Sequence, residues 1–505
     1  MDTPNRSAVS VQLLWNLVPV LCIVAAAAPF ILPRIPVGND FAKHVMVARV
    51  LTSYNQPKYG YASHFDLDLK PRPTVLGELA LAGLEKVFEP FDAAKAYLAL
   101  FVAGLWLAGR FLAVRAGQPA LAGVLLLPLA HSWPVFVGLL PFIGSIPFFA
   151  LLLGVLIGQP RGPARSAWIC LLLLVLDGFH IVGLAAGCFA VVLFAFDRKD
   201  RWRVAWGDLL ALAPAVCLAG HFLIHDRRQS SKWYYHGPIG QIKAYLGYNA
   251  WTLSRVAGVL FLGLAVALAA WVAWQAYRER KKPRLLLLAA AMVVAGLLLP
   301  VQIGDWFVVG SRTFPFAVVA TLGFLRFSRP SCRVVAAVVC GFLAVSACLN
   351  TRIALHAQEA YRIFLSGMPA VDYGARMLPV IEDLNTGGNQ YVQPFAGIED
   401  TYNVYRGGSN PYCLATPTFK TGAVILRSKY APDYAFRYSD LVPDYSGVSR
   451  KYDYVVLFGK LPEARRVVAG EMCLGFSNGP LSVFRSCRGA GAPRVAPDLT
   501  GRPDR

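Results

Sequence analysis

An aspartate follows the first apolar stretch of the chain, within the segment Gly38-Asn39-Asp40-Phe41-Ala42-Lys43-His44. A carboxylate beside a membrane interface can act as a general base or as a metal ligand. His44 comes one turn later, on the same face of the helix that Val45–Leu51 predicts. The alternative is that Asn39 and Asp40 only cap this helix. The segment therefore predicts either a chemical site beginning at Asp40 or a simple helix start.

Other ionisable side chains lie at the outer ends of later apolar stretches, namely His131, Asp177, His180 and Arg312. Such residues are costly at membrane depth, so they tend to face a protein interior or an aqueous cavity. We therefore predict that they share one outward-opening pocket with Asp40. Taken singly, each has a structural alternative, as an interfacial histidine, a turn, a cap or an interfacial anchor. The predicted catalytic set is Asp40, His44 and His180, and the predicted ligands of a divalent cation, Mg²⁺ or Mn²⁺, are Asp40 and Asp177.

Cations and aromatic rings fall on the same predicted side of the membrane. Arginine and lysine near the interface suit a lipid phosphate or pyrophosphate, and a tryptophan or tyrosine can stack on a sugar. The alternatives are a solvated loop face for the cations and an interfacial aromatic belt for the rings. The predicted substrate and phosphate contacts are Lys43, Lys70, Arg255, Arg312, His131, Trp233 and Tyr234.

These residues require a membrane scaffold, and the composition predicts one. Of the 505 residues, 56% are hydrophobic and only 15% are charged, whereas a soluble protein carries about 25% charged residues. The net charge of +20 does not indicate a nucleic-acid partner, because much of it lies in short clusters between apolar stretches, such as 197–204 and 278–284. That distribution is typical of cytoplasmic loops.

The apolar stretches predict about eleven transmembrane helices. We place them at 12–32, 92–112, 119–136, 139–158, 166–179, 181–196, 205–222, 254–277, 285–301, 313–326 and 334–350. The basic clusters then fall on one side, which makes the N-terminus cytoplasmic. The stretch 166–196 is best explained by two short helices that turn at Asp177–His180, outside the cytoplasm. The stretch 74–88 is predicted to be an interfacial amphipathic helix.

The chain divides into a transmembrane module at 1–350, whose first extracytoplasmic loop is 33–91, and a small extracytoplasmic α/β domain at 351–488. In that domain we expect a helix over 369–384 and strands at 423–426 and 452–458. Cys473 and Cys487 could pair if it lies outside the cytoplasm. Residues 489–505 are predicted to be disordered.

The pattern resembles the GT-C superfamily of integral membrane glycosyltransferases. The resembling segments are 38–44 within the loop 33–91, Gly138–Phe148, and Asp177–His180. Members carry an acidic residue soon after the first span, interfacial helices in that loop, and often a C-terminal extracytoplasmic domain. The likeness extends over about residues 10–350. One departure concerns the metal, because Asn39-Asp40 replaces the acidic pair that many members carry.

The resemblance implies a bacterial inner-membrane enzyme that moves a sugar from a polyprenyl-phosphate donor to an extracytoplasmic glycan, lipid or protein, with inversion. Asp40 would be the general base or a metal ligand, and Arg312, Arg255 or Lys70 would hold the leaving phosphate. Two other functions stay open. A transporter of lipid-linked saccharides would carry repeated halves and mid-span charges, and a non-catalytic assembly protein of the cell envelope would not need Asp40.

Overall fold

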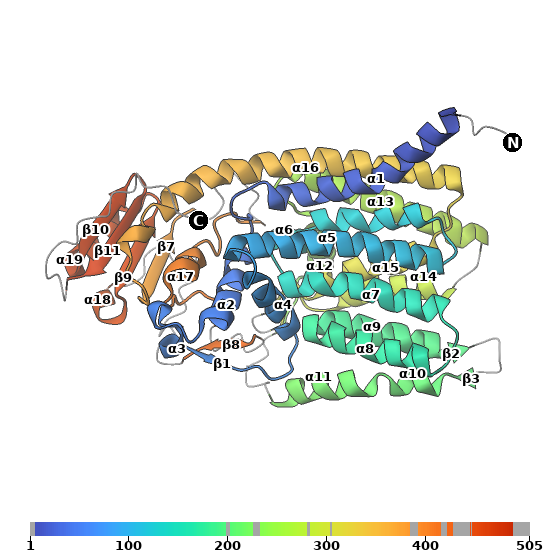
Figure 1. The fold of residues 1–505 in the computed structure, drawn as a ribbon, viewed down its shortest axis with the longest axis horizontal. Coiled ribbons are helices and arrows are strands. Elements are labelled where there is room, and N and C mark those ends of the chain that lie inside the picture. The colour runs from blue at the N-terminus through green and yellow to red at the C-terminus, as the bar shows by residue number, and fades with distance from the viewer. Residues whose placement is uncertain are drawn as a thin grey trace.

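A computed structural model of the chain describes residues 6–197, 203–225, 233–279, 283–303, 306–383, 392–415, 422–427, 445 and 447–487. Helices run along the long axis of the molecule, and a small sheet lies at one end, beyond the tip of the bundle (Figure 1). The predicted tail 489–505 lies outside the described residues.

The bundle is built from apolar helices that correspond to the predicted spans. They are α1 (Arg6–Ile31), α5 (Pro90–Arg115), α7 (Leu140–Gly158), α8 (Pro163–Phe179), α9 (Ile181–Ala195), α10 (Trp206–Leu210), α11 (Ala213–His225), α13 (Arg255–Glu279), α14 (Pro283–Leu298), α15 (Phe314–Phe324) and α16 (Arg329–Leu365). In the described part of the chain, α5, α7, α13, α16 and the α10–α11 stretch are long and apolar enough to cross a membrane. The chain is thus a multi-pass membrane protein.

The predicted span 119–136 differs from an ordinary helix. It is a 3₁₀-helix, η2 (Ala120–His131), followed by the short α6 (Trp133–Val137). At about 2 Å of rise per residue, the 12 residues of η2 extend roughly 24 Å. η2 packs so closely on α5 that a Cβ at Gly123 would lie only 2.5 Å from Arg110 N. Glycine permits this close approach.

The loop after α1 folds into a compact layer at the sheet end of the bundle (Figure 1). Its elements are α2 (Phe41–Ser53), η1 (Pro57–Tyr59), α3 (Tyr61–His64), β1 (Phe65–Leu67) and α4 (Val75–Glu85). α2 and α4 confirm the helices expected at 45–51 and 74–88. α4 packs so closely against α7 that a Cβ at Gly77 would lie 2.8 Å from Pro141 Cα.

Short elements connect the remaining helices. They are β2 (Phe196–Asp197), β3 (Arg203–Val204), β4 (Trp233–Tyr234), α12 (Pro238–Ala250), β5 (Gln302–Ile303), β6 (Trp306–Phe307), η3 (Gly310–Thr313) and η4 (Met368–Ala370). β4, β5 and β6 form a three-stranded antiparallel sheet. The turn predicted at Asp177–His180 is confirmed, because His180 stands between α8 and α9.

A four-stranded sheet forms the far end of the molecule, in the order β10–β11–β9–β7. Its elements are β7 (Met377–Ile381), α18 (Val448–Lys451), β9 (Tyr454–Phe458), α19 (Pro462–Glu471), β10 (Met472–Asn478) and β11 (Leu481–Ser486). β9 confirms the strand expected at 452–458. The helix expected over 369–384 is wrong, because β7 pairs in parallel with β9. Parallel strands are buried on both faces and lack the alternation that would identify them in sequence.

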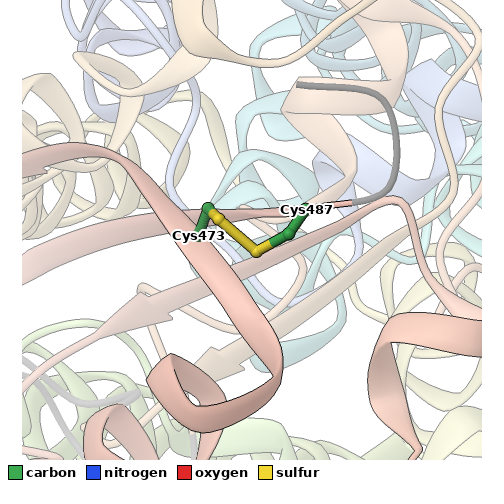
Figure 2. The surroundings of a disulfide bond; sticks show 2 residues. All are labelled: Cys473 and Cys487. Atoms are coloured by element: carbon green, nitrogen blue, oxygen red, sulfur yellow. A yellow bond between two sulfur atoms is a disulfide. The ribbon is translucent and has the colours of Figure 1, made fainter. Parts of the chain in front are cut away.

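Cys473 and Cys487 form a disulfide that joins β10 to the end of β11 (Figure 2). The sequence left this pairing conditional, and the structure confirms it. Cys413 is buried and unpaired among the described cysteines.

The segments 392–415 and 422–427 pack on the first loop. β8 (Val424–Leu426) pairs antiparallel with β1, and α17 (Asp400–Arg406) packs on α2. α16 runs through residue 350 toward the sheet (Figure 1), so the predicted division at 350 falls inside a helix. This arrangement brings distant parts of the sequence together around Asp40.

Candidate functional site

The Asp40 carboxylate lies at the start of α2 and contacts Lys43. The Asp40 backbone N–H donates to the Val137 carbonyl over 2.7 Å, which holds the turn before α2 against the turn after α6. The side chain makes no capping hydrogen bond. Instead, Asp40 Oδ1 lies 3.3 Å from Lys43 Nζ, and both side chains are less than one-fifth exposed. The acid is therefore paired with a cation rather than used as a helix cap.

Two glycines allow these turns to meet. A Cβ at Gly38 would lie 2.2 Å from Phe136 O. Gly138 has a φ of +89°, and a Cβ there would lie 2.8 Å from Phe41 N. Larger residues at either position would push the Asp40 turn away from the bundle.

Two further acids, Glu399 and Asp400, face Lys43 from the start of α17. They are 1% and 0% exposed. Burial alone would lower the pKa of Lys43, but the charges of Asp40, Glu399 and Asp400 raise it above its ordinary value. Burial, followed by the charge of Glu399, raises the pKa of Asp400 to about 8. Lys43 is thus a protonated ammonium, and Asp400 is mostly protonated at neutral pH.

The segment before α17 is fixed on the Asp40 turn by backbone contacts. The Gln393 N–H donates to Asn39 Oδ1 over 2.9 Å. Gly397 has a φ of +81°, and a Cβ there would lie 2.1 Å from Asn39 O and 3.3 Å from Lys43 Cε. The C-terminal part of the chain therefore forms one wall of the site.

His44, which the sequence placed in the catalytic set, lies beside this cluster. The residue is buried, and burial lowers its pKa to about 4. Its Nδ1 has no hydrogen-bond partner among the described residues. His44 is therefore a neutral imidazole at pH 7.

Arg312 and His180 form the second half of the site. Arg312 Nη1 lies 2.7 Å from His180 Nε2, and His180 Nδ1 accepts from the Val182 N–H over 3.2 Å. Both ring nitrogens face donors, which disfavours the charged imidazolium, and the neutral ring accepts from only one of the two donors at a time. Burial lowers the pKa of Arg312 to about 10, while the charge of Asp40 opposes this effect. Arg312 thus stays cationic and lies within electrostatic reach of the Asp40 carboxylate.

The structure therefore brings together Asp40, Lys43, His44, His180 and Arg312 from the predicted set. The other predicted contacts lie elsewhere. Lys70 is 73% exposed and lies 3.9 Å from Asp68, and Arg255 is exposed at the start of α13. Trp233 and Tyr234 are more than half exposed on β4. Among the described residues, none of these four contacts Asp40.

His131 has a structural role in place of the predicted substrate contact. It is completely buried. Its Nδ1 lies 2.7 Å from Ser346 Oγ and its Nε2 lies 3.1 Å from the Ala26 carbonyl. Both nitrogens are used to join η2 to α16 and α1, so the ring has no nitrogen left to form a hydrogen bond with a ligand.

The predicted metal ligands do not converge. Within the described ranges, no three His, Cys, Asp or Glu side chains gather in an arrangement that could hold a metal ion. Asp177 is buried in α8, and no contact links it to Asp40. The Lys43 ammonium at 3.3 Å and the nearby Arg312 already neutralise Asp40. A divalent cation fits this set of groups poorly.

Sequence reasoning missed Glu399 and Asp400. The chain has only 29 acidic residues, and two adjacent ones after the turn-forming Gly397 were a usable signal. It also missed Glu78 on α4, which is 6% exposed and accepts from the Ala423 N–H over 2.7 Å. The surroundings of these acids are set by contacts between segments more than 300 residues apart in the sequence, which the local pattern does not indicate.

Two solved structures of similar fold cover nearly the whole chain. ArnT from Cupriavidus metallidurans bound to undecaprenyl phosphate has a TM-score of 0.56 and 14% identity, covering 96% of this chain and 100% of its own. Its apo state has a TM-score of 0.55 and 14% identity, covering 97% and 100%. The apo Archaeoglobus fulgidus oligosaccharyltransferase has a TM-score of 0.44 and 12% identity, covering 90% and 70%. No protein-family model and no curated protein matches the sequence. The chain therefore has the fold of the two ArnT structures, in agreement with the fold expected from the GT-C resemblance.

Proposed function

We propose that the protein transfers a sugar from a polyprenyl-phosphate donor to an acceptor outside the cytoplasm, with Asp40 as the general base. One observation carries this proposal. The Asp40 carboxylate is not used as a helix cap and interacts with two cations, Lys43 at 3.3 Å and Arg312 within electrostatic reach. Transfer from a phosphate-linked sugar needs both a base for the acceptor and positive charge for the leaving group.

The reaction is a single displacement at the anomeric carbon. The acceptor hydroxyl oxygen forms the new bond to that carbon while its proton passes to Asp40. The bond from the anomeric carbon to the phosphate oxygen breaks, and its electron pair leaves with the phosphate. Lys43 and Arg312 stabilise the developing negative charge, and His180 orients Arg312 through its 2.7 Å contact. One displacement inverts the anomeric configuration.

An apolar cavity supports a lipid-linked donor. It has a volume of about 230 Å³ and lies between η2, α13, α15 and α16, where only apolar residues line it, including Leu129, Phe261 and Val339. Phe314 also lines it and follows Arg312 by two positions. An isoprenoid chain in this cavity would bring its phosphate close to the Arg312 guanidinium. The ArnT structure that holds undecaprenyl phosphate supports the same class of donor.

The basic clusters and the disulfide support an orientation in the bacterial inner membrane. Clusters such as 197–204 and 278–284 favour a cytoplasmic face, and the helix ends that lead into them, at Ala195 of α9 and Glu279 of α13, lie at the end of the bundle away from the sheet (Figure 1). Disulfides persist in oxidising compartments, so the Cys473–Cys487 bond favours a periplasmic sheet. The Asp40 site then opens to the periplasm.

The test is transfer by the purified protein in proteoliposomes. Radiolabelled polyprenyl-phosphate sugars and membrane extract would be supplied to the wild type and to Asp40→Asn. We expect labelled product from the wild type and about 100-fold less from the variant, which is the lower range for a general base. Asp92→Asn is the matched control, because Asp92 pairs with Lys95 and is 58% exposed.

The outcomes separate the possible functions. Equal transfer by the wild type and Asp40→Asn would move the base elsewhere. Absence of transfer from every donor would overturn the enzymatic proposal, and donor crossing the bilayer with its sugar bond intact would identify a transporter.

A further inference from the structure

A second cationic cluster lies apart from Asp40, where three segments of the chain meet. Lys58 Nζ lies 4.3 Å from the centre of the Tyr373 ring, and Arg406 Cζ lies 4.7 Å from the same ring. Lys58 belongs to η1 and Arg406 ends α17, whereas Tyr373 precedes β7. Tyr373 is 42% exposed, so the cluster is open to solvent.

The two cations have no acidic partner in the described part of the chain. No ion pair involves Lys58 or Arg406, in contrast to exposed cations such as Arg362, which pairs with Glu359. The nearest acid in sequence, Asp372, accepts from the Tyr454 hydroxyl over 2.8 Å instead. Two like charges on one ring repel each other, and an anion between them would remove that cost.

The backbone holds the cluster rigidly. The Gly408 N–H donates to the Tyr59 carbonyl and the Gly374 N–H donates to the Arg406 carbonyl, each over 2.8 Å. A Cβ at Gly407 would lie 2.1 Å from Tyr59 O. The backbone segments that carry Lys58 and Arg406 are therefore held together before any ligand binds, which lowers the entropic cost of binding.

The phenol of Tyr373 is influenced by both cations. Burial acts to raise its pKa, but the hydrogen bonds and charges of Lys58 and Arg406 outweigh burial and lower the pKa below its ordinary value. The three polar groups thus converge on one small volume. A guanidinium, an ammonium and a hydroxyl are the donors that a phosphate group prefers.

We propose that Lys58, Tyr373 and Arg406 form a binding site for a phosphate group, separate from the Asp40 site. α17 connects the two sites, with Asp400 in its first turn and Arg406 at its last residue. At 1.5 Å of rise per residue, these positions are about 9 Å apart along the helix. A ligand could therefore reach both, but the site does not depend on the proposed transfer reaction.

The first test measures the binding of inorganic phosphate to the full-length protein in detergent by calorimetry, at constant ionic strength. We expect saturable binding that is at least about tenfold weaker in a Lys58→Gln, Arg406→Gln double variant. Tyr373→Phe should weaken it less. Arg362→Gln, which removes an exposed arginine that is paired with Glu359, should bind like the wild type. Equal affinity in the wild type and the double variant, or no saturable binding in the wild type, would overturn the proposal.

A second measurement uses only the wild type, in case the double variant does not fold. Phosphate should slow the acylation of Lys58 by an amine-reactive reagent, read by mass spectrometry, and leave Lys70 unaffected. Equal rates with and without phosphate would count against the site. Nanodiscs of phosphatidylcholine with or without phosphatidylglycerol distinguish the sources of the phosphate. A lipid headgroup would protect Lys58 only in the anionic discs, whereas a soluble phosphate ligand would protect it in both.

Discussion

The buried Glu78 carboxyl should make the stability of the protein fall with rising pH. Glu78 is 6% exposed, and its Oε2 accepts from the Ala423 N–H over 2.7 Å. Burial raises its pKa from 4.5 to about 7, and the backbone hydrogen bond only partly opposes this. At about 1.4 kcal/mol per pH unit, this difference corresponds to roughly 3 kcal/mol.

The sign follows from proton binding. The folded state holds the Glu78 proton more tightly than the unfolded chain, so unfolding releases it between pH 4.5 and about 7. Stability is therefore lost as the pH rises through this window. Glu78→Gln keeps an oxygen for the Ala423 N–H and removes the charge. The variant should match the wild type near pH 4 and exceed it by about 3 kcal/mol near pH 8.

Thermal unfolding in detergent, followed by tryptophan fluorescence from about pH 4 to about pH 8.5, measures this difference. A gain of about 3 kcal/mol should raise the unfolding midpoint of Glu78→Gln by several degrees at the upper end. Glu359→Gln makes the same chemical change at an exposed position of α16. Above about pH 5, its unfolding midpoint should differ from that of the wild type by a constant amount. A constant offset between wild type and Glu78→Gln over the whole range would refute the burial argument, as would a less stable variant at pH 8.

Three further substitutions test other contacts. Gly397→Ala should cost about 1–2 kcal/mol for its left-handed backbone, and more from its clash with Asn39. The control Gly470→Ala lies in α19 with nothing within 4 Å, so in the same unfolding assay it should be neutral or stabilise by up to about 1 kcal/mol. Lys43→Met should lose transfer activity and cost about 3–5 kcal/mol, because it leaves buried acids without their cation; retained activity would remove Lys43 from the site. His131→Ala should cost about 1–3 kcal/mol and leave the transfer rate of the folded fraction unchanged, and a selective fall in that rate would contradict its structural role.

The sequence predicted what local patterns determine. Apolar stretches and basic clusters located the helices of the bundle, and the polar Asp177–His180 step located the turn between α8 and α9. Asp40 could also be found, because it follows the first span directly. The 3₁₀ geometry of η2 could not, because close packing between Gly109 and Gly123 has no local signature in the sequence.

Side-chain pairing across the fold was not predictable from either partner alone. His131 had the type and position of a ligand contact, but Ser346 and Ala26 use both of its nitrogens. Adjacent acids such as Glu399 and Asp400 are usually found on the surface, but here the packing of α17 on α2 accompanies their burial. In each case the deciding residue is far away in sequence, so the local pattern was equally compatible with both roles.

The charge balance around Lys43 links the two halves of the chain. With segment 392–410 removed from α2, Lys43 would face only Asp40, and the ammonium would be free to neutralise it. With the segment in place, Glu399 and Asp400 also face Lys43, and together with Asp40 they raise the pKa of the buried ammonium above its ordinary value. The C-terminal segment thus acts on the first loop through one lysine. The protonated ammonium beside Asp40 depends on contacts made some 360 residues later in the chain.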